Sequence, residues 1–270
     1  MNSRPVPMPG PIPRTGGLRR VLFAHAHPDD ETLASGCLIA DLTGRGVEVG
    51  VLTATRGERG EVVDGPLSHL AGTDALIEHR AGELAAALRT LGVTWHAVLG
   101  TPPARADGLP PRVYRDSGMR WLTATLAGPA EDVTPDALTS ADVQVAAVDL
   151  AAAVTAYQPD LLVSYDITGG YGHPDHVRMH AVTLTAAELT GVATAELVMP
   201  GGDTPDLNLP GRQATADAAL TWFDLPETLP TVRAALAAYA SQLRVEGTDV
   251  IHVGGRREPI VTRVGLRRVR

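Results

Sequence analysis

Short apolar runs alternate with longer amphipathic segments over the first 190 residues. The short runs are rich in Val and Leu and predict buried strands, expected at 19–24, 47–53, 95–100 and 159–165. The longer segments carry apolar residues at helical spacing and predict helices, expected at 31–44, 74–91, 141–157 and 177–189. This alternation predicts one α/β domain: a Rossmann-like, mostly parallel sheet flanked by helices, with right-handed crossovers and a smaller C-terminal extension.

The pattern is weaker outside this region. Residues 1–18 are rich in Pro and Gly and predict a disordered leader, which leaves residues 19–270 as one domain. Residues 101–140 predict a long excursion between elements. After residue 190 we expect edge strands at 197–199 and 220–223 and a helix at 229–243. Two extended segments at 250–253 and 259–264 and a solvated edge at 263–270 are expected to follow.

Composition narrows the chemistry. The 270 residues have a formal net charge of −8, and all 23 basic residues are Arg, which excludes Schiff-base and P-loop lysine chemistry. The chain has no basic tract, so we expect no nucleic-acid partner. The single cysteine, Cys37, excludes an intramolecular disulfide and a multi-cysteine zinc site. We also expect no membrane partner and a cytoplasmic location, since no long apolar run is present; the oligomeric state is left open.

Two polar clusters directly follow predicted strands. HAHPDDE, residues 25–31, follows the first strand, and GGYGHPDH, residues 169–176, comes shortly after the strand that ends at Tyr165. In open α/β sheets, ligands bind beyond the carboxyl ends of the strands. The two clusters are therefore predicted to meet at one site.

The residue types in these clusters suit a catalytic zinc ion, which takes three protein ligands and keeps one position for water. Two histidines and one carboxylate form the natural ligand set. A neighbouring carboxylate can then accept a proton from the water, and a second histidine can protonate the leaving group. Spacing alone does not show which aspartate binds the metal. The simpler alternative, two polar turns with helix-capping aspartates, does not explain the paired histidines.

The motifs AHPDDE and GGYGHPDH resemble those of the LmbE-like, or PIG-L, family of zinc-dependent N-deacetylases. With GERGE, HRAGEL and YRDSGM they are most similar to the branch that deacetylates N-acetylglucosaminyl-inositol in mycothiol biosynthesis. The resemblance covers roughly residues 19–186, with weaker similarity near AAYASQ. It implies hydrolysis of an N-acetyl group from a small amino-sugar conjugate.

The resemblance also implies a role for each matching position. It implies one Zn²⁺ per chain, with Fe²⁺ as the alternative metal in the cell, and the implied ligands are His27, Asp30 and His176. The implied catalytic residues are Asp29 as general base, His173 as general acid with Asp175 behind it, and Tyr171 as the group that stabilises the oxyanion. The implied substrate contacts are Arg80, Asp116 and Glu61.

Some features leave alternatives open. Arg80 can pair with a glutamate on its own helix, and Asp116 can be a turn former. The chain after the second motif is shorter than the resemblance predicts, and Tyr239 of AAYASQ stands where a histidine is expected. The substrate is thus less well defined than the metal chemistry.

Four rival functions remain. Two use the same chemistry: a mycothiol S-conjugate amidase, and a deacetylase of another N-acetylglucosaminyl glycoside of antibiotic type. A noncatalytic sugar-binding protein would need neither Asp29 nor His173. A two-metal phosphatase would need more carboxylates than Asp166 and Asp175 at the second cluster.

Overall fold

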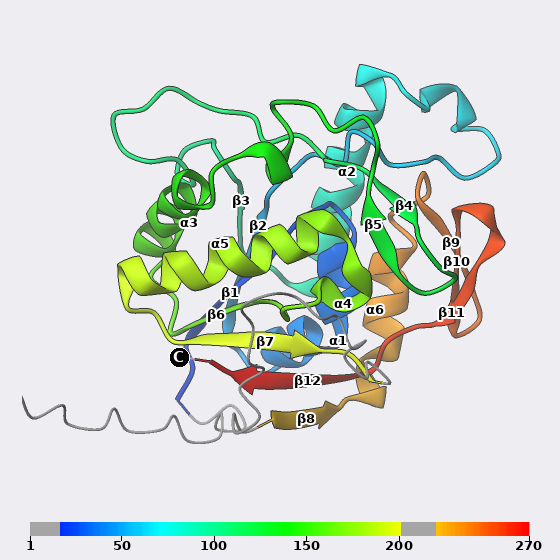
Figure 1. Cartoon of the computed structure of the whole chain (residues 1–270). Helices are drawn as coiled ribbons and strands as arrows, with labels where there is room; N and C mark the ends of the chain where they lie inside the picture. Colours follow the sequence, from blue (N-terminus) through cyan, green and yellow to red (C-terminus); the bar gives the residue numbers. More distant parts are fainter. Residues whose placement is uncertain (1–16, 201–219, 270) are drawn as a thin grey trace, which may run out of the picture.

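A seven-stranded sheet organises the chain in the computed structural model, which describes residues 17–200 and 220–269. The strand order is β3-β2-β1-β6-β7-β12-β8 (Figure 1). These strands are β1 (Arg20–His25), β2 (Glu48–Thr53), β3 (Trp95–Val98), β6 (Leu161–Tyr165), β7 (Thr194–Val198), β8 (Leu220–Asp224) and β12 (Arg263–Arg268). The first five in spatial order are parallel, and β12 is antiparallel to both β7 and β8.

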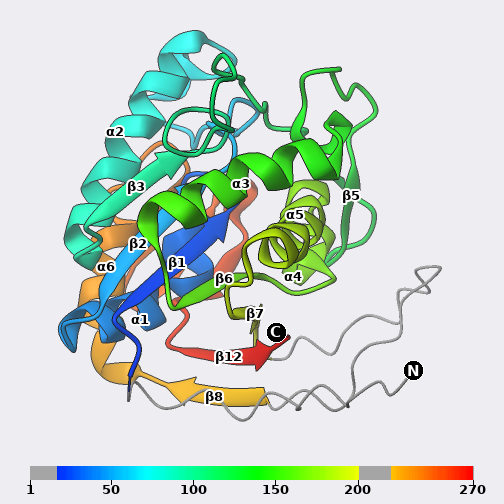
Figure 2. The ribbon, with the colours of Figure 1, turned by 90° about the vertical axis from the view of Figure 1, so that its left-hand side faces the viewer.

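Helices cover both faces of this sheet (Figure 2). One layer contains α1 (Asp30–Gly44), α2 (Asp74–Leu91) and α6 (Leu229–Leu236), and the other contains α3 (Val143–Tyr157) and α5 (Pro174–Thr190). Side chains of β1 alternate between the two cores: Val21 and Phe23 face the first layer, whereas Leu22 and Ala24 face the second. A strand buried on both faces needs apolar residues at every position, which explains its continuous apolar run.

Two small antiparallel sheets lie outside this framework. The 101–140 excursion forms a hairpin of β4 (Met119–Trp121) and β5 (Ala127–Pro129). The C-terminal part forms a three-stranded sheet of β9 (Leu243–Glu246), β10 (Asp249–His252) and β11 (Arg257–Pro259). The two small sheets lie on the same side of the molecule (Figure 1). The remaining short helices are α4 (Gly169–Gly172) and four 3₁₀ helices at Ser68–Leu70, Leu138–Ser140, Pro226–Thr228 and Val253–Gly255.

The α/β fold and the elements up to residue 190 are confirmed, with boundaries that differ by up to three residues. The predicted edge strand at 197–199 is wrong, because β7 lies between β6 and β12. The solvated edge at 263–270 is also wrong: β12 lies between β7 and β8, and its Val264 and Leu266 are buried. The edge strand at 220–223 is confirmed by β8.

The predicted helix at 229–243 ends at Leu236, and the extended segment at 259–264 is split between β11 and β12. Tertiary contacts explain the early helix end, since the side chains of Tyr239 and Ser241 bond to glutamates on α1 and α2. The predicted leader falls almost entirely on residues 1–16, outside the described part of the chain. None of the helices within 17–200 and 220–269 combines the length and the apolar character that a bilayer-crossing segment needs.

Candidate metal and active site

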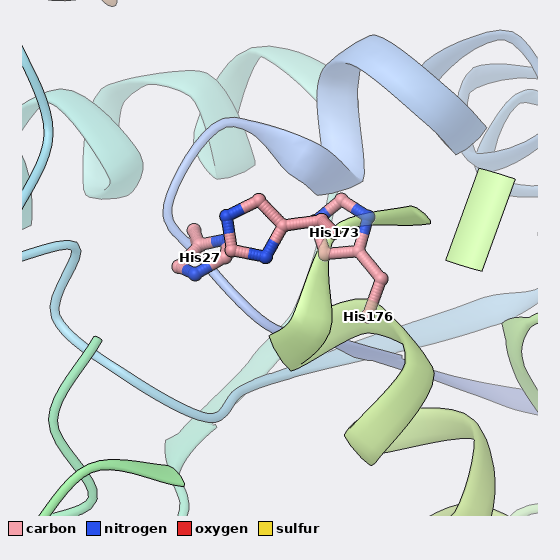
Figure 3. A group of neighbouring side chains, drawn as sticks. All are labelled: His27, His173 and His176. Atoms are coloured by element: carbon pink, nitrogen blue, oxygen red, sulfur yellow. The ribbon is translucent and has the colours of Figure 1, made fainter. Parts of the chain in front are cut away.

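The two polar clusters meet at the carboxyl ends of β1 and β6, which are adjacent parallel strands. The turn after β1 carries His27, and the start of α5 carries His173 and His176 (Figure 3). The imidazole centroids of His27 and His173 are 4.6 Å apart, and those of His27 and His176 are 5.4 Å apart. The sheet topology thus assembles three imidazoles from segments almost 150 residues apart in sequence.

Asp30 lies between the histidines of the two clusters. Its Oδ2 is 3.2 Å from Nδ1 of His27, and its Oδ1 is 3.3 Å from Nε2 of His176. The hydroxyl of Tyr165, at the end of β6, donates a hydrogen bond of 2.7 Å to Oδ2. One carboxylate therefore touches both imidazoles, and the neighbouring strand fixes its orientation.

The orientation of His176 suits a metal ligand. Its Nδ1 lies 3.1 Å from the carbonyl oxygen of Gly169, so the ring proton belongs on Nδ1 and the lone pair on Nε2. That Nε2 is buried, and within the described residues its 3.3 Å contact with Asp30 Oδ1 does not have the geometry of a hydrogen bond. Ligating histidines commonly donate their other N–H to a backbone carbonyl in this way.

The charge of the pocket also favours a cation. Nε2 of His27 is 3.1 Å from Asp175 Oδ2 and 3.6 Å from Asp116 Oδ1, and both carboxylates are buried. Burial lowers the pKa of His27, but Asp116, Asp175 and Asp30 outweigh it and raise the pKa well above the usual value. Burial opposes ionisation of Asp30, yet His176 and His27 hold its pKa well below the usual range. Several buried carboxylates thus surround a point that needs positive charge.

Two groups of side chains in the described regions have ligand atoms close enough to share an ion. One group is His27, His173 and His176, and the other is His27, Asp116 and Asp175. They overlap at His27. The set His27, Asp30 and His176 is linked instead through the two oxygens of Asp30. The donor atoms are nitrogen and carboxylate oxygen, which are the ligands of catalytic zinc sites.

Asp29 precedes helix α1 in an uncommon backbone conformation, with φ 109°. A residue other than glycine held in such a region costs about 1–3 kcal/mol. Its Oδ2 accepts a 3.0 Å hydrogen bond from Nη2 of Arg80. Burial raises the pKa of Asp29 to about 8, although Arg80 acts in the opposite direction. Such a carboxyl group can exchange a proton near neutral pH.

His173 caps helix α5. Its Nδ1 accepts a 3.2 Å hydrogen bond from the backbone N–H of Asp175, and Pro174 occupies the first helical position. This cap explains why α5 begins three residues before the predicted helix. Burial lowers the pKa of His173 well below its usual value, and His27 and His176 add to the effect. The neutral ring therefore carries its proton on Nε2.

The carboxylate of Asp175 contacts His27, whereas its link to His173 runs through the backbone. It also accepts hydrogen bonds from the N–H (2.9 Å) and the hydroxyl (2.5 Å) of Ser117. Ser117 and Tyr165 were not predicted as site residues. Tyr165 ends the strand before the second motif, and that position was the available signal; Ser117 lies inside YRDSGM but resembles an ordinary turn residue.

The three positions implied to contact substrate have different environments. Arg80 is 2% exposed, and Asp116 is 7% exposed and lies beside His27. Glu61 is exposed, in the loop after β2. The other glutamate of GERGE, Glu58, reaches this region instead, since its Oε2 accepts a 3.0 Å hydrogen bond from the N–H of Asp116.

Aromatic side chains lie beside the imidazoles. Tyr171 is 37% exposed, and its ring centroid is 5.3 Å from that of His176. Trp121 at the end of β4 is 44% exposed and stacks on Tyr171 at 5.6 Å. The guanidinium carbon of Arg256 lies 5.3 Å from the centroid of the Trp121 ring. Trp121 was missed because no motif contains it, and only the folded hairpin places it here.

Residues 22–187 match the family model described as PIG-L, GlcNAc-PI de-N-acetylase. The chain belongs to the PIG-L family. It is 48% identical over 171 residues to a 1D-myo-inositol 2-acetamido-2-deoxy-alpha-D-glucopyranoside deacetylase of Kineococcus radiotolerans, a match covering 63% of this chain and 45% of that protein. It is 42% identical over 192 residues to a protein of the same name from Kribbella flavida, covering 70% and 60%. The chain thus spans about half the length of these relatives.

Solved structures support the same fold. A deacetylase in complex with teicoplanin, from the biosynthesis pathway of teicoplanin, matches with a TM-score of 0.57 and 23% identity. The alignment covers 93% of this chain and 98% of that one. An N,N'-diacetylchitobiose deacetylase from Pyrococcus horikoshii matches with a TM-score of 0.52 and 19% identity, covering 83% and 72%.

Glu31, the last residue of the HPDDE motif, hydrogen-bonds to the part of the chain that follows the family match. Glu31 is fully buried, and its Oε1 accepts hydrogen bonds from the hydroxyls of Thr32 and Tyr239, the latter at 2.5 Å. Its Oε2 accepts a 3.1 Å hydrogen bond from the N–H of Asp29. Tyr239 thus lies in the core behind the site, at the position where the resemblance led us to expect a histidine.

Proposed function

We propose that this PIG-L domain is a metal-dependent amidohydrolase that removes the acetyl group from an N-acetylglucosaminyl conjugate. The substrate that we propose is 1-(2-acetamido-2-deoxy-glucopyranosyl)-myo-inositol, an intermediate of mycothiol biosynthesis. The names of the related Kineococcus and Kribbella proteins support this choice. The observation that carries the proposal is the meeting of two metal-ligand clusters with a carboxyl group and an imidazole beside them.

The ligands that we assign are His27, Asp30 and His176, and the metal that we assign is zinc. The two-sided contact of Asp30 with His27 and His176 supports this set over the group that includes His173. In PIG-L chemistry a bound divalent ion would make a water acidic enough to lose a proton near neutral pH and would polarise the amide carbonyl.

Side chains of the protein would perform the proton transfers and stabilise the oxyanion. The Asp29 carboxylate takes the proton from the attacking water, and the C–O bond forms at the acetyl carbon. The Tyr171 hydroxyl donates a hydrogen bond to the oxyanion. His173 in its imidazolium form gives the Nε2 proton to the amine nitrogen as the C–N bond breaks, which releases acetic acid and the free amino sugar. The proton held by Asp29 then returns to His173 and restores both groups.

We place the sugar against Trp121 at the mouth of the site. Its exposed ring stacks on Tyr171, so a pyranose bound there has its acetamido group near the imidazoles. Apolar C–H faces of sugars pack on aromatic rings, and the guanidinium of Arg256 beside the ring can donate hydrogen bonds to hydroxyls.

The test is acetate release from a panel of N-acetylglucosaminyl compounds by the zinc-loaded protein, with metal content measured on the same sample. We expect release from the inositol conjugate and one metal ion per chain. Cleavage of a mycothiol S-conjugate instead would identify a mycothiol S-conjugate amidase. Acetate release only from an antibiotic-type glycoside would identify a deacetylase of such glycosides. Sugar binding without any release would support the noncatalytic reading, and two ions per chain with phosphate release would support the phosphatase.

A further inference from the structure

The 101–140 excursion meets the candidate metal site at Ser117, which is 1% exposed. Its backbone N–H donates to Oδ2 of Asp175 at 2.9 Å, and its hydroxyl donates to Oδ1 of the same side chain at 2.5 Å. One residue therefore binds both oxygens of a carboxylate that is itself fully buried. A buried carboxylate needs such donors, because it has lost the water that would otherwise solvate its charge.

A second segment of the excursion fixes the direction of the Ser117 hydroxyl. The backbone N–H of Thr139 donates to Oγ of Ser117 at 3.0 Å, and the hydroxyl of Thr139 donates to the same oxygen at 2.8 Å. A serine hydroxyl has one proton and two lone pairs. Because both lone pairs accept from Thr139, the proton of Ser117 is directed to Asp175.

The local turn does not explain the serine. Within this turn, Oδ1 of Asp116 accepts a 2.8 Å hydrogen bond from the N–H of Gly118, and Gly118 has φ 68°. An aspartate that bonds to the backbone two residues on is the usual device of such turns. The hydroxyl of Ser117 bonds outside the turn, to Asp175 and Thr139. The turn therefore accounts for Asp116 and Gly118 but not for Ser117.

The oriented carboxylate of Asp175 determines which nitrogen of His27 is left for a metal ion. Oδ2 of Asp175 lies 3.1 Å from Nε2 of His27, whereas Oδ1 of Asp116 lies 3.6 Å from it, beyond hydrogen-bond distance. An ionised carboxylate only accepts hydrogen bonds, so the proton of a neutral, ligating ring belongs on Nε2. The lone pair is then on Nδ1, which lies 3.2 Å from Oδ2 of Asp30.

We propose that Ser117 is a positioning residue for the metal centre: it holds the Asp175 carboxylate so that His27 turns Nε2–H toward Asp175 and Nδ1 toward the ion. A carboxylate behind a ligating histidine commonly sets the tautomer and the ring orientation of that histidine. This inference rests on the proposed function for the role of His27 as a ligand. Metal affinity tests it without any need for turnover.

The test is the Kd for zinc, measured by competition with a chelating dye, for the wild type, Ser117→Ala and Ser164→Ala. Ser117→Ala removes the hydroxyl donor to Asp175 but keeps Asp175 itself. We therefore expect the Kd to rise by about 10-fold, the lower end of the usual effect of changing the groups behind a ligating histidine.

Ser164→Ala, on β6, is the matched control. Ser164 is also 1% exposed, and its hydroxyl donates to the carbonyl oxygen of Ala24 at 2.8 Å. This variant loses a buried hydroxyl of the same kind and should leave the Kd for zinc unchanged. The free energy of unfolding, measured on the metal-free proteins, separates a loss of stability from a loss of metal affinity.

An unchanged Kd for zinc in Ser117→Ala would overturn the proposal, even if the variant is less stable than the wild type. If Ser117→Ala does not fold, Thr139→Val decides. It removes one of the two bonds that orient the Ser117 hydroxyl and should raise the Kd by a smaller factor, and an unchanged Kd there would equally contradict the positioning role.

A crystal structure of the zinc-loaded wild type gives an independent decision. Nδ1 of His27 on the ion with Nε2 on Asp175 would support the proposal, whereas Nε2 on the ion would refute it. A wild type that binds zinc but releases acetate from no compound of the panel would refute the proposed function alone, and the comparison of zinc affinities would still decide on Ser117.

Discussion

The alternating half of the molecule, from β1 to α5, differs sharply from the part that begins at β7. Among the described residues, each group that can hold a metal ion comes from the first half. The second part supplies side chains that reach the first half from behind: Tyr239 bonds to Glu31, and Ser241 bonds to Glu83 through its N–H (2.7 Å) and its hydroxyl (2.6 Å). One region carries the candidate metal ligands, and the other packs behind them.

This difference shows in which region the resemblance to the family assigns roles to individual residues. The motifs lie in the region that carries the candidate metal ligands, and the family match ends at residue 187. Tyr239, beyond that match, lies behind Glu31 rather than beside the candidate ligands.

The largest expected effect tests whether the second part is needed for stability. Leu266 of β12 is 3% exposed and belongs to the core shared with α1 and α2. Leu266→Ala should lower the free energy of unfolding by about 2–5 kcal/mol, the usual cost of truncating a buried leucine. Leu189→Ala, at an exposed position of α5, should change it by less than about 0.5 kcal/mol. Equal values in urea denaturation would contradict an interior β12.

A smaller effect should separate support of the site from support of the fold. Tyr239→Phe leaves buried Glu31 without the hydroxyl and should cost about 1–3 kcal/mol of unfolding free energy. Turnover should also fall, because Glu31 holds the N–H of Asp29. Tyr114→Phe is the control, since its buried hydroxyl donates to Asp149. It should cost similar stability with unchanged kcat, and a parallel loss of kcat there would show that the effect of Tyr239 is not specific.

The smallest effect concerns the outer rim, where the hairpin meets Arg256 from the second part. Trp121→Ala should raise KM by about 2–10-fold, corresponding to the roughly 0.5–1.5 kcal/mol of an aromatic stacking contact. The free energy of unfolding should change by much less than for a core residue, about 0.5–1 kcal/mol, since Trp121 is 44% exposed. An unchanged KM for the preferred substrate would remove Trp121 from the binding site.

Much of the fold could be predicted from sequence because its signals are local. The helix at Asp74–Leu91 was predicted at its observed boundaries, and β1 was predicted within one residue. The C-terminal strands were harder to place. β12 becomes an interior strand only because it pairs with both β7 and β8, and its Arg-rich sequence does not reveal those partners.

The site shows the same limit. The meeting of the two motifs followed from their positions after predicted strands, because ligands bind beyond the carboxyl ends of the strands in such sheets. His27 and His176 could be proposed as ligands from the resemblance. The buried position of Arg80 could not be foreseen, since it depends on the close approach of Gly57 and Gly60, in the loop after β2, to its guanidinium. Likewise, Asp116 resembled a turn residue until the fold placed its carboxylate 3.6 Å from His27.

The most direct measurement of the central claim is metal content beside acetate release in His27→Ala and Asp29→Ala, each compared with the wild type. His27→Ala should lose both the bound ion and turnover. Asp29→Ala should keep one ion per chain while turnover falls by about 10²–10⁴-fold, the usual contribution of a general base. Near-normal turnover in Asp29→Ala, or a full complement of metal in His27→Ala, would contradict the account.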